Sequence, residues 1–212
     1  MKITAIVAAR NESLYLERCF KHLKAQGIDI CYIDNGSTDG SLDIAHRFLG
    51  KGILRIEEFP YKGFYDWKGL LEYKEKLANE ISSDWFIHCD ADEIMEAPQP
   101  FATLTEGIRT ADKLGYNVIN FDEFVFLPTE SSENFEERDY VAEMKHYYFF
   151  EPKPLRLMRA WKKQSAGVGL SSEGGHGLQI NDLQIFPENF VLRHYITLSQ
   201  SHALSKYGSR IY

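Results

Sequence analysis

Paired cysteines are missing from this 212-residue sequence. It has three cysteines, Cys19, Cys31 and Cys89, and no two of them form a C-x-x-C pair. They show no metal-finger spacing, and two of them lie in strongly apolar segments. We therefore expect three small buried thiols in a protein of a reducing compartment.

Long apolar stretches are missing as well. No run approaches the ~18 consecutive apolar residues that a membrane-spanning helix needs. The apolar run at residues 3–9 is too short for a signal peptide and leads at once into Arg10, Asn11 and Glu12. We expect a cytoplasmic protein with no transmembrane segment, in which the two Asn-x-Ser sequons are not glycosylated.

The sequence also lacks an excess of positive charge. It has 24 lysines and arginines against 31 aspartates and glutamates, a net charge of −7. Binding to nucleic acid through its phosphates needs a basic face, so we expect no nucleic-acid partner. There is no G-x-x-x-x-G-K-[ST] phosphate loop, and the Gly167-Val-Gly169 string lacks the last glycine of a dinucleotide fingerprint.

The first 95 residues alternate between apolar runs and helical patterns. A content of 44% hydrophobic and 26% charged residues is typical of a globular domain. Alternation at this spacing predicts right-handed crossovers and a parallel sheet with helices on both faces. The predicted strands are residues 3–9, 28–33, 53–59 and 85–89, with helices in the three intervals between them.

Beyond Pro98 the pattern is looser and richer in β-structure. We expect a helix at 100–114 and then a strand at 116–127 that Asp122-Glu123 interrupts. A polar loop at 128–140 follows. The last predicted elements are strands at 154–161 and 186–197 around a Gly-rich turn at 167–177, and a weak helix at 198–212.

Three carboxylates follow the fourth predicted strand, in Asp84-Trp-Phe-Ile-His-Cys-Asp90-Ala-Asp92-Glu93. Open α/β sheets bind ligands at the carboxyl ends of their strands, where Asp90, Asp92 and Glu93 should emerge together. Their mutual repulsion favours a divalent cation such as Mg²⁺, which is commonly held by one or two carboxylates and by phosphates of the substrate. The alternative interpretation is that the string only caps a following helix.

A second string, Asp34-Asn-Gly-Ser-Thr-Asp-Gly40, follows the second predicted strand. Its glycines permit tight turns, and Asp34 is predicted at the same sheet edge as Asp90. A carboxylate there can accept a hydrogen bond from the ring N–H of a nucleobase. Taken alone, the string is equally typical of an ordinary capped turn.

Together with Ala9-Arg10-Asn11-Glu12, these strings resemble, in the same order, family 2 glycosyltransferases of the GT-A fold. The bacterial subgroup with Asn-Glu and Asp-x-Asp-Glu motifs is the most similar, over residues 3–96. The resemblance implies an α/β fold, with a mostly parallel sheet flanked by helices and a smaller β-rich acceptor portion. It implies one domain over 1–212, with a nucleotide-sugar-binding half (1–97) and an acceptor-binding half (98–212).

The resemblance also implies roles for particular residues. Asp92, with Asp90 and His194, would bind Mn²⁺ or Mg²⁺, although a histidine in an apolar strand is equally typical of a packed core residue. Lys68 would add a positive charge at the diphosphate, although an exposed helix lysine is an equally good interpretation. The residues assigned to the nucleotide sugar are Ala9, Arg10, Glu12, Asp34, Lys68, Asp90 and Ala91.

The catalytic base is the least defined assignment. Relatives place an acidic pair before a helix, and this sequence has no clear equivalent. Inverting transfer needs a base that takes the acceptor's hydroxyl proton. Glu173 and His176, in the Gly-flanked turn, are the first candidates, and Asp122 and Glu123 follow.

The predicted function is metal-dependent, inverting transfer of a sugar from a nucleoside-diphosphate donor to a hydroxyl of a glycan or glycolipid. The resemblance places it in bacterial surface glycan synthesis, with peripheral association at the inner membrane face left open. A nucleotidyltransferase is an alternative, but residues 8–12 do not form the Gly-rich basic loop of that class. A degenerate nucleotide-sugar-binding module is a second alternative, motivated by the missing acidic pair.

Overall fold

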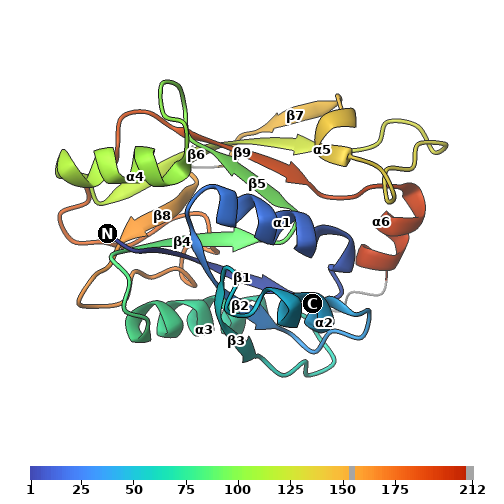
Figure 1. Cartoon of the computed structure of the whole chain (residues 1–212), viewed down its shortest axis with the longest axis horizontal. Coiled ribbons are helices and arrows are strands. Elements are labelled where there is room, and N and C mark those ends of the chain that lie inside the picture. Colours follow the sequence, from blue (N-terminus) through green and yellow to red (C-terminus); the bar gives the residue numbers. More distant parts are fainter. Residues whose placement is uncertain (153–155, 209–212) are drawn as a thin grey trace.

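The structure is a computed structural model that describes residues 1–152 and 156–208. Its first half alternates strands and helices as predicted (Figure 1). The strands pair in parallel in the order β3-β2-β1-β4. The elements are β1 (Ile3–Ala9), α1 (Ser13–Ala25), β2 (Asp29–Asp34), α2 (Ser41–Phe48), β3 (Ile53–Glu58), α3 (Trp67–Glu80) and β4 (Trp85–Asp90).

Helices cover both faces of this parallel half. Every residue of β1 is buried, as expected of a central strand that is covered on both sides. Val7 faces the core formed with α1 and α2, whereas Ile6 faces the core formed with α3. Leu16 and Phe20 fill the first core, and Leu71 fills the second. The alternation along β1 therefore divides the interior into two apolar layers.

The second half continues the same sheet with mixed strand directions. β8 pairs antiparallel with both β4 and β6, and β9 pairs parallel with β6. β5 pairs antiparallel with β9, and β7 pairs antiparallel with β6. The strand order is β3-β2-β1-β4-β8-β6-β9-β5, and β7 pairs with β6 off this path; Figure 1 shows β3 near the bottom and β7 near the top. The elements are β5 (Glu93–Glu96), α4 (Leu104–Lys113), β6 (Val118–Phe126), α5 (Tyr140–Glu143), β7 (Tyr147–Phe150), β8 (Met158–Lys162), β9 (Phe190–Tyr195) and α6 (Gln200–Tyr207).

Several predicted boundaries in the second half are wrong. The strand predicted over 116–127 is not interrupted at Asp122-Glu123, because Glu123 turns inward while Asp122 accepts a hydrogen bond from Asn189. β5 and β7 were not predicted. The strand predicted from residue 154 begins at Met158, and residues 154 and 155 lie outside the described part.

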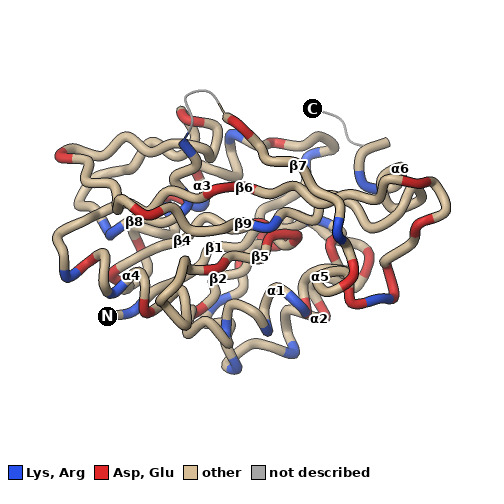
Figure 2. The backbone as a smooth tube through the Cα atoms, turned by 90° about the horizontal axis from the view of Figure 1, so that it is seen from above, with Lys and Arg blue, Asp and Glu red and all other residues tan. Residues whose placement is uncertain are grey.

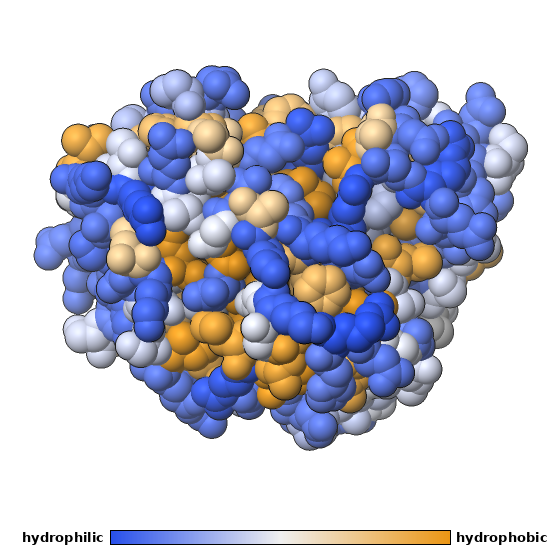
Figure 3. Space-filling model, viewed as in Figure 1, coloured by the Kyte–Doolittle hydropathy of each residue, from blue (hydrophilic) through white to orange (hydrophobic). Residues whose placement is uncertain are grey.

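The surface of the molecule is polar and mixed in charge. Figure 2 shows acidic and basic residues interspersed along the elements that surround the sheet. On the face seen in Figure 3, apolar side chains lie between hydrophilic ones. Within residues 1–152 and 156–208, every helix is too short or too polar to cross a bilayer.

Candidate active site

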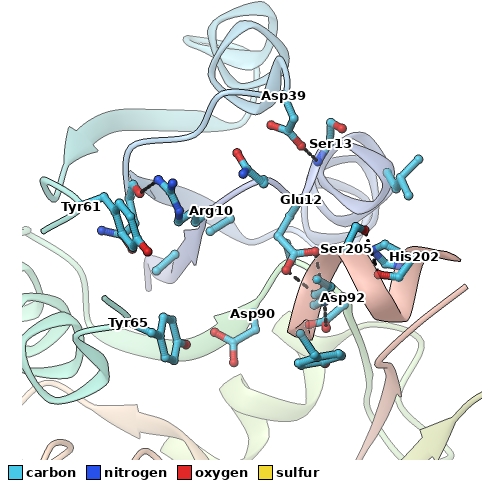
Figure 4. Close-up of a pocket in the computed structure, with 18 of the residues that line it drawn as sticks. Arg10, Glu12, Ser13, Asp39, Tyr61, Tyr65, Asp90, Asp92, His202 and Ser205 are labelled. Carbon is cyan, nitrogen blue, oxygen red and sulfur yellow. Dashed lines mark hydrogen bonds and ion pairs between the residues drawn. The ribbon is translucent and has the colours of Figure 1, made fainter. Parts of the chain in front are cut away.

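A cavity of about 520 Å³ opens at the carboxyl ends of β1 and β4 (Figure 4). Its walls come from the β1–α1 turn, the turn after β2, the loop after β3, the residues after β4, and α6, together with Leu70 of α3 and His194 of β9. In the parallel register Ala8 pairs with Asp90 and Ala9 with Asp34, so three predicted motifs end at one sheet edge. The volume lies within the range of small-molecule sites, and the position is the one that open α/β sheets use for ligands.

Asp90 ends β4, and its carboxylate points into the cavity (Figure 4). One of its oxygens accepts a hydrogen bond of 3.2 Å from the ammonium of Lys74, which belongs to α3. Lys74 is fully buried and also contacts His88 Nδ1 at 2.8 Å and the carbonyl of Cys89 at 3.1 Å. A buried ammonium needs such partners, and in return it fixes the orientation of Asp90.

Asp92 lies deeper and is almost fully buried. The ammonium of Lys206, from α6, lies 2.8 Å from its carboxylate and 3.0 Å from that of Glu12. Burial alone would raise the pKa of Asp92, but the charges of Lys206 and His194 lower it well below its usual range. Burial likewise opposes the charge on Lys206, whereas Asp92 and Glu12 raise its pKa. The site therefore holds a cation between two carboxylates.

His194, in β9, connects Asp92 to a second buried carboxylate. Its Nε2 lies 3.3 Å from Asp92, and its Nδ1 lies 2.6 Å from Glu123. Burial would lower the pKa of His194, but the two carboxylates raise it well above its usual value. The imidazole is therefore a charged link that donates to a carboxylate on each side.

Glu93 does not emerge beside Asp90 and Asp92 as the sequence predicted. It begins β5, is buried, and pairs with Arg159 of β8 at 2.8 Å. Its other oxygen accepts the backbone N–H of Asp90 at 2.9 Å. Burial raises the pKa of Glu93 to about 7, against the opposing effect of Arg159. Glu93 thus stabilises the backbone of the Asp90–Glu93 motif from within the core.

Arg10 holds the Asp34–Gly40 turn against the cavity. Its guanidinium lies 3.5 Å over the ring of Tyr61 and donates to the carbonyls of Asn35 and Gly36. The carboxylate of Asp34 accepts the N–H of Ser37 at 2.9 Å, and Asp34 does not line the cavity, whereas Asn35 does. Asp34 therefore stabilises the conformation of the turn and does not face the cavity.

Lys68, Glu173 and His176, like Asp34, lie outside the cavity. Lys68 is exposed on α3, 3.8 Å from Glu72. Glu173 accepts a hydrogen bond from Gln179 at 2.9 Å, and His176 packs edge-on against Phe150. The turn that carries Glu173 and His176 lies beside β4. Its Gly175 is packed so closely against His88 of that strand that an added Cβ would lie 3.1 Å from His88 Nε2. Of the other predicted residues, Ala9, Arg10, Glu12, Asp90, Ala91, Asp92 and His194 all line the cavity.

Two lysines at the site were not predicted. Lys74 had a signal in the sequence, since it falls on the apolar stripe of its helix, four residues after Leu70 and three before Leu77. Lys206 had none, because its partners Glu12 and Asp92 lie 194 and 114 residues away. Contacts of that sequence separation follow from the tertiary fold alone.

The side chains around Asp92 fit a divalent cation only if the Lys206 ammonium is absent from between the carboxylates. In the described part of the chain, no three side chains of His, Cys, Asp or Glu are already gathered as metal ligands. Glu12 and Asp92 nevertheless converge on one cation, the Lys206 ammonium, and His194 lies against Asp92. Two carboxylates and an imidazole suit Mn²⁺ or Mg²⁺, so the residues fit a metal if that ammonium withdraws.

The fold and the cavity define a GT-A protein, and the chain belongs to glycosyl transferase family 2, whose model matches residues 4–122. It is 27% identical over 97 residues to a lipopolysaccharide core biosynthesis glycosyltransferase, LpsC, of Rhizobium meliloti (strain 1021), covering 45% of this chain and 33% of LpsC. An uncharacterized glycosyltransferase of Rickettsia bellii (strain RML369-C) is 26% identical over 92 residues, covering 43% of this chain and 28% of the relative. The chain spans about a third of the length of these curated relatives.

Solved structures agree on the fold. Residues 1–349 of S. aureus TarS superpose with a TM-score of 0.55 at 12% identity, covering 92% of this chain and 60% of the other. The complex of the same TarS segment with UDP gives a TM-score of 0.51 at 10% identity, covering 99% and 63%. The predicted family and GT-A fold are therefore confirmed.

Proposed function

We propose that this chain is a glycosyltransferase that moves a sugar from a nucleoside-diphosphate donor to a hydroxyl of a glycan or glycolipid. The observation that carries the proposal is the cavity in which Asp90 and Asp92 face Arg10 and Glu12 at the carboxyl edge of the sheet. Membership of family 2 supports the reaction class. A TarS structure contains UDP, which supports a nucleoside diphosphate as the leaving group here.

The nucleoside would lie at the Arg10 side of the cavity. Tyr61 and Tyr65 offer aromatic surfaces there, and Asn35 lines the wall that Arg10 fixes. Asp34 would act through the turn that it braces, and Asp90, oriented by Lys74, would face the ribose. Lys68, exposed on α3, would reach the diphosphate only after its side chain leaves Glu72.

Asp92 and Glu12, with His194 beside them, would hold Mn²⁺ or Mg²⁺, with Glu12 in place of Asp90, the second carboxylate assigned to the metal from the sequence. When bound, the metal would supply positive charge to the diphosphate as the glycosidic bond breaks. Glu123 accepts a hydrogen bond from His194 Nδ1, so Nε2, which faces Asp92, could bind the metal after it loses its proton. His194, Glu123 and Lys206 belong to residues 98–212, so the proposed acceptor half also completes the donor site.

The acceptor side remains a proposal from the sequence. Glu173, with His176, would take the acceptor's proton in an inverting transfer, which requires their turn to approach the cavity from its place beside β4. The name of LpsC motivates a surface glycolipid as acceptor, at the inner face of a bacterial membrane.

The decisive experiment is a donor screen followed by turnover. Nucleoside diphosphates with and without Mn²⁺ should give metal-dependent thermal stabilisation by one base, since a ligand that binds only the folded state raises its stability. The matching nucleotide sugars are then incubated with hydroxyl acceptors, and diphosphate release is measured. Release without loss in chelator would contradict metal dependence. Donor binding without any release would indicate a binding module instead.

A further inference from the structure

The ammonium of Lys206 lies between the carboxylates of Glu12 and Asp92, the two side chains proposed above as metal ligands. It contacts Asp92 at 2.8 Å and both oxygens of Glu12, at 3.0 and 3.1 Å, and its side chain is almost fully buried. Glu12 follows β1, Asp92 follows β4, and Lys206 belongs to α6, the last helix of the described chain. Three distant segments therefore converge on one positive charge.

The same two carboxylates cannot serve the ammonium and a divalent cation together. Mg²⁺ binds carboxylate oxygens at about 2.0–2.1 Å and tolerates little distortion of its octahedron. An ammonium left within hydrogen-bond distance of those oxygens would repel the metal at close range.

The helix that carries Lys206 is capped at its start. Ser199 accepts the N–H of His202 at 2.9 Å, and the His202 side chain is buried. In the second turn Leu204 is largely exposed, whereas the Lys206 ammonium also lies 4.9 Å from the Tyr15 ring and the Tyr207 hydroxyl donates to the carbonyl of Ile196 at 3.3 Å. The ion pairs of Lys206 are therefore part of what holds this turn, and a cation that replaces Lys206 between the carboxylates would loosen it.

We propose that Lys206 and a divalent cation are alternative occupants of the Glu12–Asp92 pair, so that the second turn of α6 is a plug that metal binding displaces. The proposal rests on the metal dependence proposed above. It adds that, without metal, the Lys206 ammonium occupies the Glu12–Asp92 pair. The metal affinity of the unaltered protein is then reduced by the fraction of time that Lys206 occupies this pair.

The test is Mn²⁺ affinity, measured by the paramagnetic resonance signal of free Mn²⁺. Lys206→Ala should bind Mn²⁺ at least about tenfold more tightly than the unaltered chain, the factor expected if the plug is open about a tenth of the time. Lys206→Arg keeps the positive charge and should keep the weak affinity. Lys21→Ala, at an exposed lysine of α1, should change nothing. Equal or weaker binding by Lys206→Ala, or no binding by any form, would overturn the proposal.

A second measurement avoids substitutions altogether. Hydrogen exchange of the unaltered protein should show the amides of residues 203–207 losing protection when Mn²⁺ is added, while those of α4 do not change. Mn²⁺ binding with unchanged or increased protection of α6 would also overturn the plug. Sugar transfer is assayed separately, so a failed plug with intact metal-dependent transfer leaves the proposed function standing.

Discussion

Replacing Lys74 with Met should destabilise the fold and weaken donor binding. The methionine keeps most of the buried stem, so the packing change is small. It removes the donor of three contacts, to His88 Nδ1, Cys89 O and Asp90 Oδ1. His88 Nε2 already has no hydrogen-bond partner among the described residues, so both ring nitrogens would be unpaired.

The magnitude follows from those contacts. Two buried acceptors left without a donor cost about 1 kcal/mol each at the low end of the known range. The Asp90 carboxylate loses its cation, but its side chain is 28% exposed and water compensates in part, which leaves about 1 kcal/mol more. The sum of about 3 kcal/mol corresponds to a fall in Tm of about 6–12 °C for a chain of this size.

The assay is urea unfolding followed by tryptophan fluorescence, together with the KM for the donor. Lys76→Met is the matched control, since Lys76 belongs to the same helix but is exposed and 3.7 Å from Glu80. Pairs of that kind contribute about 0.3–0.5 kcal/mol. We expect the donor KM to rise in Lys74→Met alone, because Asp90 loses its orientation. If the two variants lie within about 1 kcal/mol of each other, the reasoning about Lys74 is refuted.

Three further predictions concern the metal, the base and a charge far from the site. Asp92→Asn should lower transfer by at least about 100-fold and abolish stabilisation by Mn²⁺, and retained transfer would exclude Asp92 as a ligand. Glu173→Gln should lower kcat by about 100-fold or more at unchanged KM if Glu173 is the base, and unchanged kcat would limit it to its hydrogen bond with Gln179. Burial opposes ionisation of Asp112, but Lys162 and Trp85 lower its pKa below the usual 3.8. The advantage of the unaltered chain over Asp112→Asn, about 0.5 kcal/mol, should be present above pH 4 and vanish as the pH falls through the lowered pKa. Unfolding at pH 7 and pH 3 measures it, and an advantage that grows in acid would contradict this sign.

The parallel half could be predicted because each of its strands has a local sequence signal. Residues 3–9 and 85–89 are apolar runs that need cover on both faces, whatever the rest of the chain does. β5 could not be predicted in this way, since Glu93-Ile-Met-Glu96 begins and ends with carboxylates. Glu93 is buried only because Arg159, 66 residues later, neutralises it.

The site was predictable to the extent that strand ends determine it. Asp90 and Asp92 reach the cavity because β4 ends there, and Arg10 and Glu12 do so because β1 is its parallel neighbour. Glu173 and Lys68 are candidates because of their chemical type alone, and no local sequence feature determines where their side chains lie. Of the two lysines that neutralise the motif, Lys74 lies 16 residues before Asp90 and on the apolar stripe of its helix, whereas Lys206 depends on contacts with residues 114 and 194 positions away.

The neutralisation of Asp92 by His194 and Lys206 constrains how the two halves of this chain can be exchanged with those of relatives. A chimera that joins residues 1–97 to the second half of a relative would lose the counter-charges of Asp92. Unless the incoming half brings equivalents of both cations, Asp92 becomes a buried, uncompensated anion. If residues 98–212 bind the acceptor as proposed, substitutions for a new acceptor would also alter the charge around Asp92, so donor and acceptor preferences should evolve as linked traits.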